Sequence, residues 1–341
     1  MRFDHRRFCR RGVRFRHHDN KIRRRDHMIF NARDKITRGL LSLARSPLPF
    51  HLYYRRHFPL PSVILIENTN CCNAHCVMCP REKLTRKPGV MAFALFEKII
   101  REVSGAKRNP VVHLHGFGEP LLDESLPERI RLAKSFGITH TYLVTNASLL
   151  FAGTARKIIG AGLDEMKISF YGTDDESYSR TMRGLDFKVA LNNIRRFVKI
   201  RKEMKKKTPK LILQYMPQKT NGAGPQEFTF LWRSVLDQKM GDRLNFVSPD
   251  NFGGGREYNP VKGKIASVCF YPWSAMSVLR DGRAVTCCVD YNGVQGAGDL
   301  NSQTVMEIWN GPVMSNIRKN FGKLDYSGFP VCQCCDWVHR R

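Results

Sequence analysis

The cysteines of this 341-residue chain are the residues best suited to chemistry, and their spacing is regular. Three of them, Cys72, Cys76 and Cys79, form a CxxxCxxC motif soon after an apolar run. In a cytosolic chain, which we expect this one to be, short regular spacings indicate metal ligands rather than disulfides. Three thiolates leave one iron of a four-iron, four-sulfur cluster without a protein ligand, so a substrate or cofactor can bind that iron. A zinc site would need a fourth ligand, for which His75 is the local candidate.

A second group of six cysteines lies between residues 269 and 335. It follows a Gly- and Asn-rich stretch that begins near Gly253, and such a composition is typical of a linker. The sequence therefore predicts three parts: an N-terminal arm at residues 1–60, a core domain at residues 61–250, and a linker with a small Cys-rich domain at residues 251–341.

The core segment alternates short β-branched runs with amphipathic helical patterns. Six strands that alternate with helices imply right-handed βαβ units and a parallel sheet. We expect an α/β fold, a partial (β/α)6 TIM-like barrel, with ligands bound at the carboxyl ends of the strands. The predicted strands lie at residues 62–67, 111–115, 140–144, 165–170, 211–216 and 244–247, and the predicted helices at 93–103, 126–136, 154–161, 187–202 and 228–236.

Composition narrows the class of protein. With 42% hydrophobic and 26% charged residues, the chain is typical of a globular protein and not of a disordered or disulfide-rich one. No apolar run is long enough to cross a bilayer, so we expect a cytoplasmic protein without a transmembrane segment.

The formal net charge is +27, and residues 1–60 hold 17 Lys and Arg against 4 Asp. This basic arm predicts contact with an anionic partner, with a solvated tail as the alternative.

The cysteine motif and two segments that follow the next predicted strands resemble the motifs of the radical S-adenosylmethionine (SAM) enzymes. The sequence CNAHCVMC, residues 72–79, is similar to the cysteine signature of that family. After the second predicted strand, the segment Gly116 to Pro120 resembles the Gly-Gly-Glu motif, with Phe117 in place of one glycine. Thr145 and Asn146 follow the third strand, as in the Thr-Asn pattern of the family. The resemblance covers residues 62–250.

The resemblance implies a set of SAM-binding residues near the carboxyl ends of the strands. Met78 stands where the family usually has an aromatic residue against the adenine, and methionine can supply the same apolar contact. Arg183, after the fourth strand, is a further candidate for a carboxylate of SAM or of the substrate, with an exposed loop arginine as the alternative. The implied cofactor-binding residues are Met78, Gly116, Gly118, Glu119, Asn146, Ser169 and Arg183.

The Cys-rich tail resembles the SPASM/twitch extension of radical SAM enzymes. Gly282 stands five residues before Cys287, as in the GX4C element of that extension, and a CxxC pair closes the tail. Six cysteines are too few for two auxiliary clusters, so the resemblance implies one auxiliary 4Fe-4S cluster; a four-cysteine zinc ribbon is the alternative. Cys288 is a tentative catalytic hydrogen donor, or else a buried structural cysteine. The implied auxiliary ligands are Cys269, Cys287, Cys332 and Cys335.

The activity implied by these resemblances is reductive cleavage of SAM to a 5′-deoxyadenosyl radical, which takes hydrogen from a substrate C–H bond. The auxiliary cluster would then transfer an electron, giving oxidation or epimerisation of a sugar-like or natural-product metabolite. A peptide substrate is the alternative. The expected partners are the substrate and a low-potential electron donor such as flavodoxin or ferredoxin. A nucleic-acid-directed protein and a non-catalytic metal-binding protein are the alternatives from other classes.

Overall fold

The computed structural model describes residues 60–105, 110–218, 224–256, 265 and 268–339. The predicted basic arm, apart from Leu60, lies outside the described residues. No helix in the described part of the chain is long and apolar enough to span a membrane.

Six strands and the helices between them form the predicted βα alternation. The strands are β1 (Val63–Ile66), β2 (Val111–His113), β3 (Thr141–Thr145), β4 (Glu165–Ser169), β5 (Lys210–Tyr215) and β6 (Arg243–Phe246). The main helices between and around them are α3 (Phe93–Ser104), α4 (Leu126–Ser135), α5 (Ala152–Ala161), α6 (Asp175–Thr181), α7 (Phe187–Glu203) and α8 (Pro225–Trp232). All adjacent pairs among these six strands are parallel, in sequence order, as expected for consecutive βαβ units. The partial-barrel prediction is confirmed, and the sheet is not closed.

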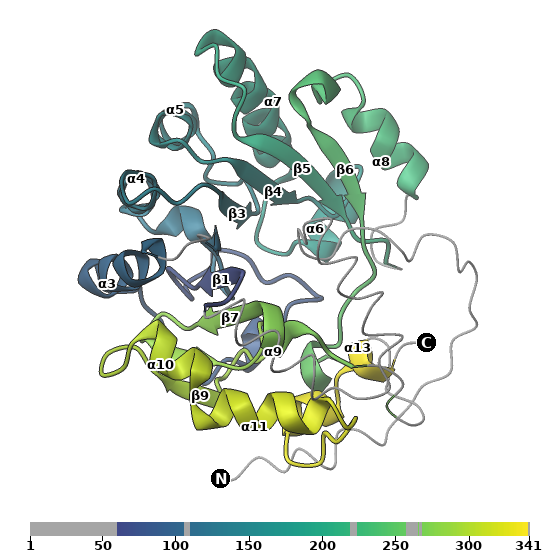
Figure 1. Cartoon of the computed structure of the whole chain (residues 1–341). Helices are drawn as coiled ribbons and strands as arrows, with labels where there is room; N and C mark the ends of the chain where they lie inside the picture. The colour runs from purple at the N-terminus through teal and green to yellow at the C-terminus, as the bar shows by residue number, and fades with distance from the viewer. Residues whose placement is uncertain (1–59, 106–109, 219–223, 257–264, 266–267, 340–341) are drawn as a thin grey trace.

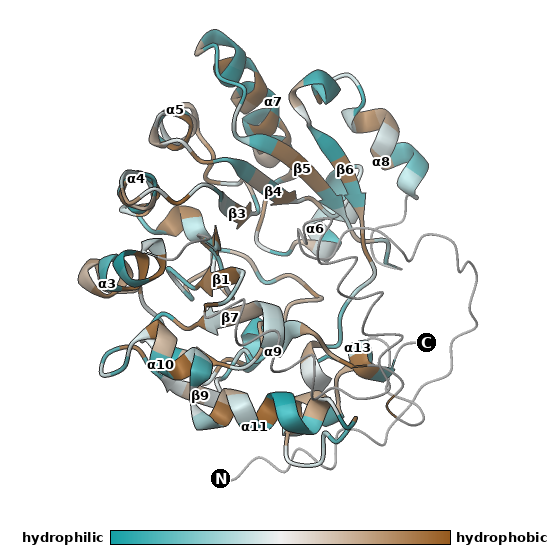
Figure 2. Cartoon of the chain, viewed as in Figure 1, coloured by the Kyte–Doolittle hydropathy of each residue, from teal (hydrophilic) through white to brown (hydrophobic). Residues whose placement is uncertain are grey.

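Local sequence explains the helices around the sheet. In α3 the buried residues Phe96, Ile99, Ile100 and Val103 recur at helical spacing and face the core. Helix α7 begins where the Asp186 side chain accepts a hydrogen bond from the backbone N–H of Val189, which satisfies one of its first free donors. Figure 1 shows the helices arranged around the outside of the curved sheet, and Figure 2 shows that α7 carries both apolar and polar residues.

The two faces of the sheet differ in chemistry. Alternate residues, such as Ile64, Leu143 and Ile168, are fully buried under the helices. On the opposite, inner face the strands present polar side chains: His113, Tyr142, Lys167, Gln214 and Asn245. A polar inner face at the centre of a sheet is costly unless partners or a ligand satisfy it.

The Cys-rich tail extends the same sheet. Its strands are β7 (Ala275–Val278), β8 (Arg283–Val285) and β9 (Gly296–Asp299), and its helices are α9 (Tyr271–Ser274), α10 (Val305–Asn310), α11 (Pro312–Phe321), α12 (Pro330–Gln333) and α13 (Asp336–His339). Strand β7 pairs in parallel with β1, from Val63 opposite Ala275 to Ile66 opposite Val278. Strands β8 and β9 follow as antiparallel neighbours. The tail therefore shares one nine-stranded sheet with the core, which the sequence reading as a separate small module does not predict.

The described part of the predicted linker is packed. Gly253 and Gly254 have φ values of 61° and 90°, and a Cβ on Gly253 would lie 2.5 Å from the Val331 side chain. The Asn251 Nδ2 donates a hydrogen bond to the backbone oxygen of Cys334 at 2.6 Å. Glycine here provides left-handed backbone and close packing, so its presence does not indicate a flexible connection at residues 251–256.

Candidate active site

The loop after β1 holds the three-cysteine motif and is fastened along its length. The backbone N–H of His75 donates to the Arg183 oxygen at 2.8 Å, and that of Val77 donates to the Thr181 oxygen at 3.1 Å. At the end of the loop, the Arg256 Nε donates to the backbone oxygen of Cys79 at 2.8 Å. These bonds fix the loop between the segment after α6 and the start of the tail.

The environment of this loop opposes free thiolates. Burial raises the pKa of Cys72 to about 11. Burial, followed by the charges of Cys79 and Cys72, raises the pKa of Cys76 well above its ordinary value. Three half-buried thiols in one loop ionise readily only if a cation compensates them, so the donor set fits an iron–sulfur cluster. Within the described residues, no three Cys, His, Asp or Glu side chains already converge as they would around one metal ion.

Glu119 connects the second and third motifs. Its buried carboxylate accepts hydrogen bonds from the Thr145 hydroxyl at 2.5 Å, from the Asn146 backbone N–H at 2.8 Å and from the Leu121 backbone N–H at 3.1 Å. Burial raises the pKa of Glu119 to about 7, although these hydrogen bonds favour its ionised form. The Gly-Phe-Gly-Glu and Thr-Asn motifs therefore meet at the carboxyl end of the sheet.

Two glycines permit close approach of the backbone at this point. A Cβ on Gly118 would lie 2.4 Å from the Thr69 oxygen and 2.6 Å from the Cys71 oxygen. This approach lets the Glu119 backbone N–H donate to the Cys71 oxygen at 2.8 Å, directly beside the cluster loop. A Cβ on Gly116 would instead meet the Glu67 side chain at 2.5 Å. Glycine is thus needed at position 116 because the buried Glu67 side chain leaves no room for a Cβ.

Asn73 is a site residue that the sequence analysis missed. Its Oδ1 accepts a hydrogen bond from the Asn146 Nδ2 at 3.0 Å, and its Nδ2 donates to the Ser148 Oγ at 2.8 Å. Asn73 therefore joins the cysteine loop to the Thr-Asn motif, 73 residues further along the chain. Its position inside the cysteine motif is the signal that could have identified it.

The other predicted SAM-binding residues lie in different settings. Met78 is buried, as an apolar contact residue would be. Ser169 ends β4, is partly exposed, and accepts a hydrogen bond from the Tyr171 hydroxyl at 3.1 Å; Tyr171 in turn accepts one from the Gln214 Nε2 at 2.7 Å. Arg183 has an exposed side chain, and its backbone oxygen accepts the hydrogen bond from the cysteine loop.

The four predicted auxiliary ligands gather in the tail. Burial raises the pKa of Cys269 to about 12 and that of Cys332 to about 11. Cys269 and Cys332 interact electrostatically with both Cys287 and Cys335, so the four cysteines lie in one region of the tail. Cys288 lies beside them and interacts with the Cys287 and Tyr271 side chains. As in the first group, the buried thiols fit a site that needs a cationic cluster.

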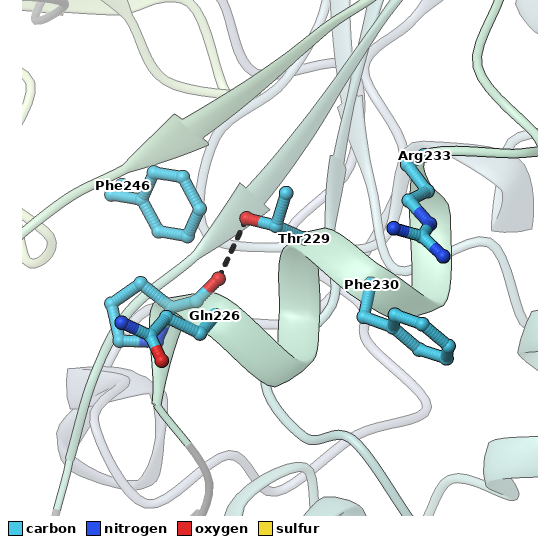
Figure 3. Close-up of a pocket in the computed structure, with 6 residues that line it drawn as sticks. Gln226, Thr229, Phe230, Arg233 and Phe246 are labelled. Atoms are coloured by element: carbon cyan, nitrogen blue, oxygen red, sulfur yellow. Dashed lines mark hydrogen bonds between the residues drawn. The ribbon is translucent and has the colours of Figure 1, made fainter.

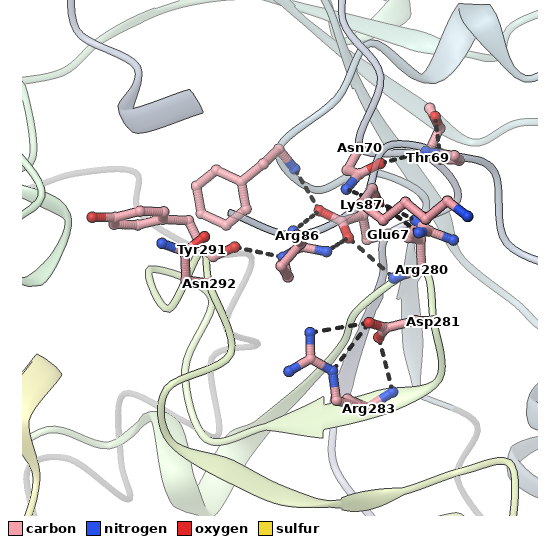
Figure 4. Close-up of polar contacts among 12 residues, drawn as sticks. Glu67, Thr69, Asn70, Arg86, Lys87, Arg280, Asp281, Arg283, Tyr291 and Asn292 are labelled. Atoms are coloured by element: carbon pink, nitrogen blue, oxygen red, sulfur yellow. Dashed lines mark hydrogen bonds and ion pairs between the residues drawn. The ribbon is translucent and has the colours of Figure 1, made fainter. Parts of the chain in front are cut away.

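A buried carboxylate joins the two cysteine groups. Glu67, directly after β1, forms a bidentate ion pair with Arg86 at 2.6 and 2.8 Å (Figure 4). The same carboxylate accepts the backbone N–H of Phe117 at 3.1 Å and that of Arg280 at 3.0 Å. Arg86 also donates to the Tyr291 oxygen at 2.6 Å, in the segment after Cys287. We call these residues the Glu67 junction; the sequence analysis did not identify it.

A shallow hollow of about 350 Å³ lies elsewhere, along α8. Figure 3 shows that Phe230 and Arg233 point to the same side of this helix, and the Arg233 guanidinium lies 4.3 Å from the Phe230 ring. None of the predicted site residues lines this hollow, so it is not part of the candidate active site.

Two family models match the chain. The model of the radical SAM superfamily matches residues 66–207, and that of the iron–sulfur cluster-binding domain called SPASM matches residues 269–336. The chain therefore contains a radical SAM domain, followed by a SPASM domain. The radical SAM domain implies SAM and a 4Fe-4S cluster as cofactors, and the SPASM domain implies auxiliary iron–sulfur binding.

Among characterised proteins, the chain is 21% identical over 279 residues to the S-adenosyl-L-methionine-dependent 2-deoxy-scyllo-inosamine dehydrogenase of Niallia circulans, covering 81% of this chain and 93% of that protein. It is 30% identical over 128 residues to a probable GTP 3′,8-cyclase of Methanothermobacter thermautotrophicus, covering 38% of this chain. The chain thus spans only 41% of the length of that cyclase.

Two solved structures show the same fold. The structure of BtrN in complex with AdoMet and 2-DOIA has a TM-score of 0.56 at 16% identity, covering 81% of this chain and 93% of BtrN. The structure of Streptococcus suis SuiB bound to precursor peptide SuiA has a TM-score of 0.61 at 13% identity, covering 95% of this chain and 78% of SuiB.

Proposed function

We propose that this protein is a radical SAM oxidoreductase that abstracts hydrogen from a C–H bond of a sugar-like or natural-product metabolite. The loop cysteines Cys72, Cys76 and Cys79 would hold the SAM-binding cluster, and the four tail cysteines would hold one auxiliary cluster. When bound, the first cluster would supply the electron for reductive cleavage of SAM, and the auxiliary cluster would take up an electron from the substrate. A low-potential donor such as flavodoxin or ferredoxin is the expected source of electrons.

The single observation that carries this proposal is the meeting of three motifs at one end of the sheet. Glu119 accepts hydrogen bonds from Thr145 and Asn146, and Asn146 bonds Asn73 within the cysteine loop. A polar group bound beside the loop would find the Glu119 carboxylate already oriented. Fixed acceptors of this kind position a ligand without reorganisation at the moment of reaction.

The resemblance to radical SAM enzymes assigns the roles of the chain's own residues. Glu119 would accept hydrogen bonds from the amino group of SAM, Met78 would pack against its adenine, and Ser169 would bond the ribose or carboxylate. The Glu67 junction holds the loop and the tail at a fixed separation. Cys288, beside the auxiliary ligands, would return a hydrogen atom to the substrate only if the reaction is an epimerisation; an oxidation needs no such donor.

The test is anaerobic reconstitution of the full chain with iron and sulfide, followed by incubation with SAM and dithionite and measurement of 5′-deoxyadenosine. We expect the native protein to form 5′-deoxyadenosine and Cys76→Ala to form none. Cys71→Ala is the matched control, because Cys71 adjoins the motif but lies outside its register. Equal loss in both variants, or no product from the native protein, contradicts the proposal.

A peptide substrate is the second candidate. It is favoured by the likeness to SuiB, whose structure contains a precursor peptide, at a TM-score of 0.61. The metabolite is favoured by the Niallia circulans dehydrogenase, which aligns over 93% of its own length. Stimulation of 5′-deoxyadenosine formation by a panel of aminocyclitols, sugar acids and sugar phosphates, but not by peptides, would select the metabolite. The reverse result selects the peptide.

A further inference from the structure

The inner face of the sheet holds a cation that the assigned roles do not use. Lys167 lies on β4, two residues before Ser169 and therefore on the same face of the strand. Its Nζ lies 5.9 Å from the centre of the Tyr142 ring on β3. Tyr142 in turn contacts the His113 ring, with centroids 4.5 Å apart, and His113 stacks on His115 at 5.3 Å. These four side chains form one cluster on β2, the loop directly after it, β3 and β4.

Three members of this cluster have a side-chain nitrogen without a hydrogen-bond partner in the described part of the chain. The Lys167 ammonium makes no hydrogen bond there, and no carboxylate lies within 4 Å of it. The His113 Nε2 and the His115 Nδ1 are likewise buried without a hydrogen-bond partner among described residues.

The negative charges that act on Lys167 come from Asp250, Cys288 and Glu165. Glu165 pairs with Arg243 at 3.2 Å, and Asp250 accepts a hydrogen bond from Trp337 at 2.6 Å.

An unpaired ammonium in such a position is unfavourable for the protein alone. Burial lowers the pKa of Lys167 to about 8, because the nearby negative charges offset only part of the lost hydration. Nevertheless the side chain is partly exposed on the inner face of a central strand, so a ligand can reach it. A cation that is deeply set, reachable and without an ion-pair partner is suited to an anionic group that arrives with the ligand.

We propose that Lys167, assisted by His113 and Tyr142, binds a carboxylate or phosphate group of the substrate. The proposal rests on the proposed function and adds the charge of the substrate to it. Two residues along a strand span about 6.6 Å. The bound anion would therefore lie about 6.6 Å further from the carboxyl end of β4 than Ser169 and the SAM proposed to bind beside it. Lys167 also interacts electrostatically with Cys288, so the substrate would extend between SAM and the auxiliary ligands.

The test measures the reactivity of Lys167 in the full, reconstituted chain by trace acetylation with acetic anhydride and peptide mass spectrometry. The probes are D-glucuronate, D-glucose 6-phosphate and neutral D-glucose. An anion beside Lys167 blocks the amine and raises its pKa, both of which slow acetylation. At ten times the dissociation constant we expect about tenfold slower acetylation with a bound anion, because about one site in eleven stays free. D-glucose should have no effect.

The three probes also separate the two sources of negative charge. Protection by glucuronate alone assigns a carboxylate, and protection by glucose 6-phosphate alone assigns a phosphate. Lys199, on the outer face of α7, is exposed and serves as the internal control. Equal acetylation of Lys167 with all three probes overturns the proposal, as does protection of Lys199 to the same extent.

Variants provide an independent measurement. A hydrogen bond to a charged group contributes about 1.5–3 kcal/mol, so Lys167→Met should weaken calorimetric binding of the protecting anion roughly 10- to 150-fold. Lys167→Arg keeps the cation and should retain most of the affinity, whereas Lys199→Met should match the native protein. Equal affinity in Lys167→Met and Lys199→Met refutes the proposal.

The same preparations separate this inference from the proposed function. If the native protein forms 5′-deoxyadenosine but neither anion slows acetylation of Lys167, only the inference is overturned. A native protein that binds an anion at Lys167 but does not cleave SAM overturns the proposed function alone.

Discussion

Replacing Arg86 by methionine tests whether the Glu67 junction holds the two cysteine groups together. The side chains of Arg86 and Glu67 are 3% and 1% exposed. The substitution removes two hydrogen bonds to the Glu67 carboxylate, of 2.6 and 2.8 Å, and a third to the Tyr291 oxygen at 2.6 Å. Among the described residues, the carboxylate then keeps the backbone N–H groups of Phe117 and Arg280 as donors. Breaking a buried ion pair from one side costs about 3–5 kcal/mol, because a buried charge is left uncompensated.

The assay is thermal unfolding of the reconstituted protein under anaerobic conditions. Proteins with bound clusters often unfold irreversibly, so apparent midpoints are compared at one fixed scan rate. For a chain of this size the expected loss lowers the midpoint on the order of 10 °C. The matched control is Arg101→Met, which removes an exposed i, i+4 pair with Glu97 at 2.6 Å and should change the midpoint by about 2 °C or less.

A double variant identifies the cause. Adding Glu67→Gln to Arg86→Met removes the uncompensated charge. The double variant should therefore lose about 1–3 kcal/mol less free energy of unfolding than the two single variants lose together. Two results would refute this reasoning. One is an Arg86→Met midpoint no lower than that of Arg101→Met, and the other is strict additivity in the double variant.

Three further predictions concern the site. Glu119 must be ionised to act purely as an acceptor, and its pKa is raised to about 7. The ratio of SAM affinity in the native protein to that in Glu119→Gln, measured by calorimetry, should therefore rise about tenfold per pH unit up to about pH 7 and level off above it. A ratio that does not change with pH contradicts this. Gly118→Ala, whose Cβ would lie 2.4 Å from the Thr69 oxygen, should lower SAM affinity and cost about 1–3 kcal/mol, whereas Gly105→Ala, with open space around it, should do neither. Cys269→Ala should lower the iron content from about eight atoms per chain to about four while the SAM-responsive cluster persists, and loss of all iron would show that the two groups are not separate.

Much of the fold could be predicted from local sequence patterns. The six core strands follow from short β-branched runs between amphipathic helices, because burial on one face and solvent on the other impose a regular spacing. Strand β7 could not be predicted in this way. Its pairing with β1 joins residues more than two hundred positions apart, and the four-residue run Ala275–Val278 carries no periodic signal that names its partner.

The site residues also fall into those that local sequence patterns predict and those that they do not. Cysteine spacing and the Gly-Phe-Gly-Glu segment are local, so both were found from the sequence. The Glu67 junction and the Asn73–Asn146 bond depend on which loops meet in space, and a lone Glu or Asn in the sequence does not indicate this. Gly116 was expected to bind SAM, but the structure gives it a different constraint, the Glu67 side chain that would contact its Cβ.

The central claim is that Cys72, Cys76 and Cys79 hold a cluster with one iron open to SAM. Electron paramagnetic resonance of the dithionite-reduced, reconstituted Cys269→Ala variant tests it most directly, because that variant should lack the auxiliary signal. The account predicts a reduced-cluster spectrum that changes when SAM is added and disappears when Cys72→Ala is introduced as well. A spectrum that SAM leaves unaltered would contradict it.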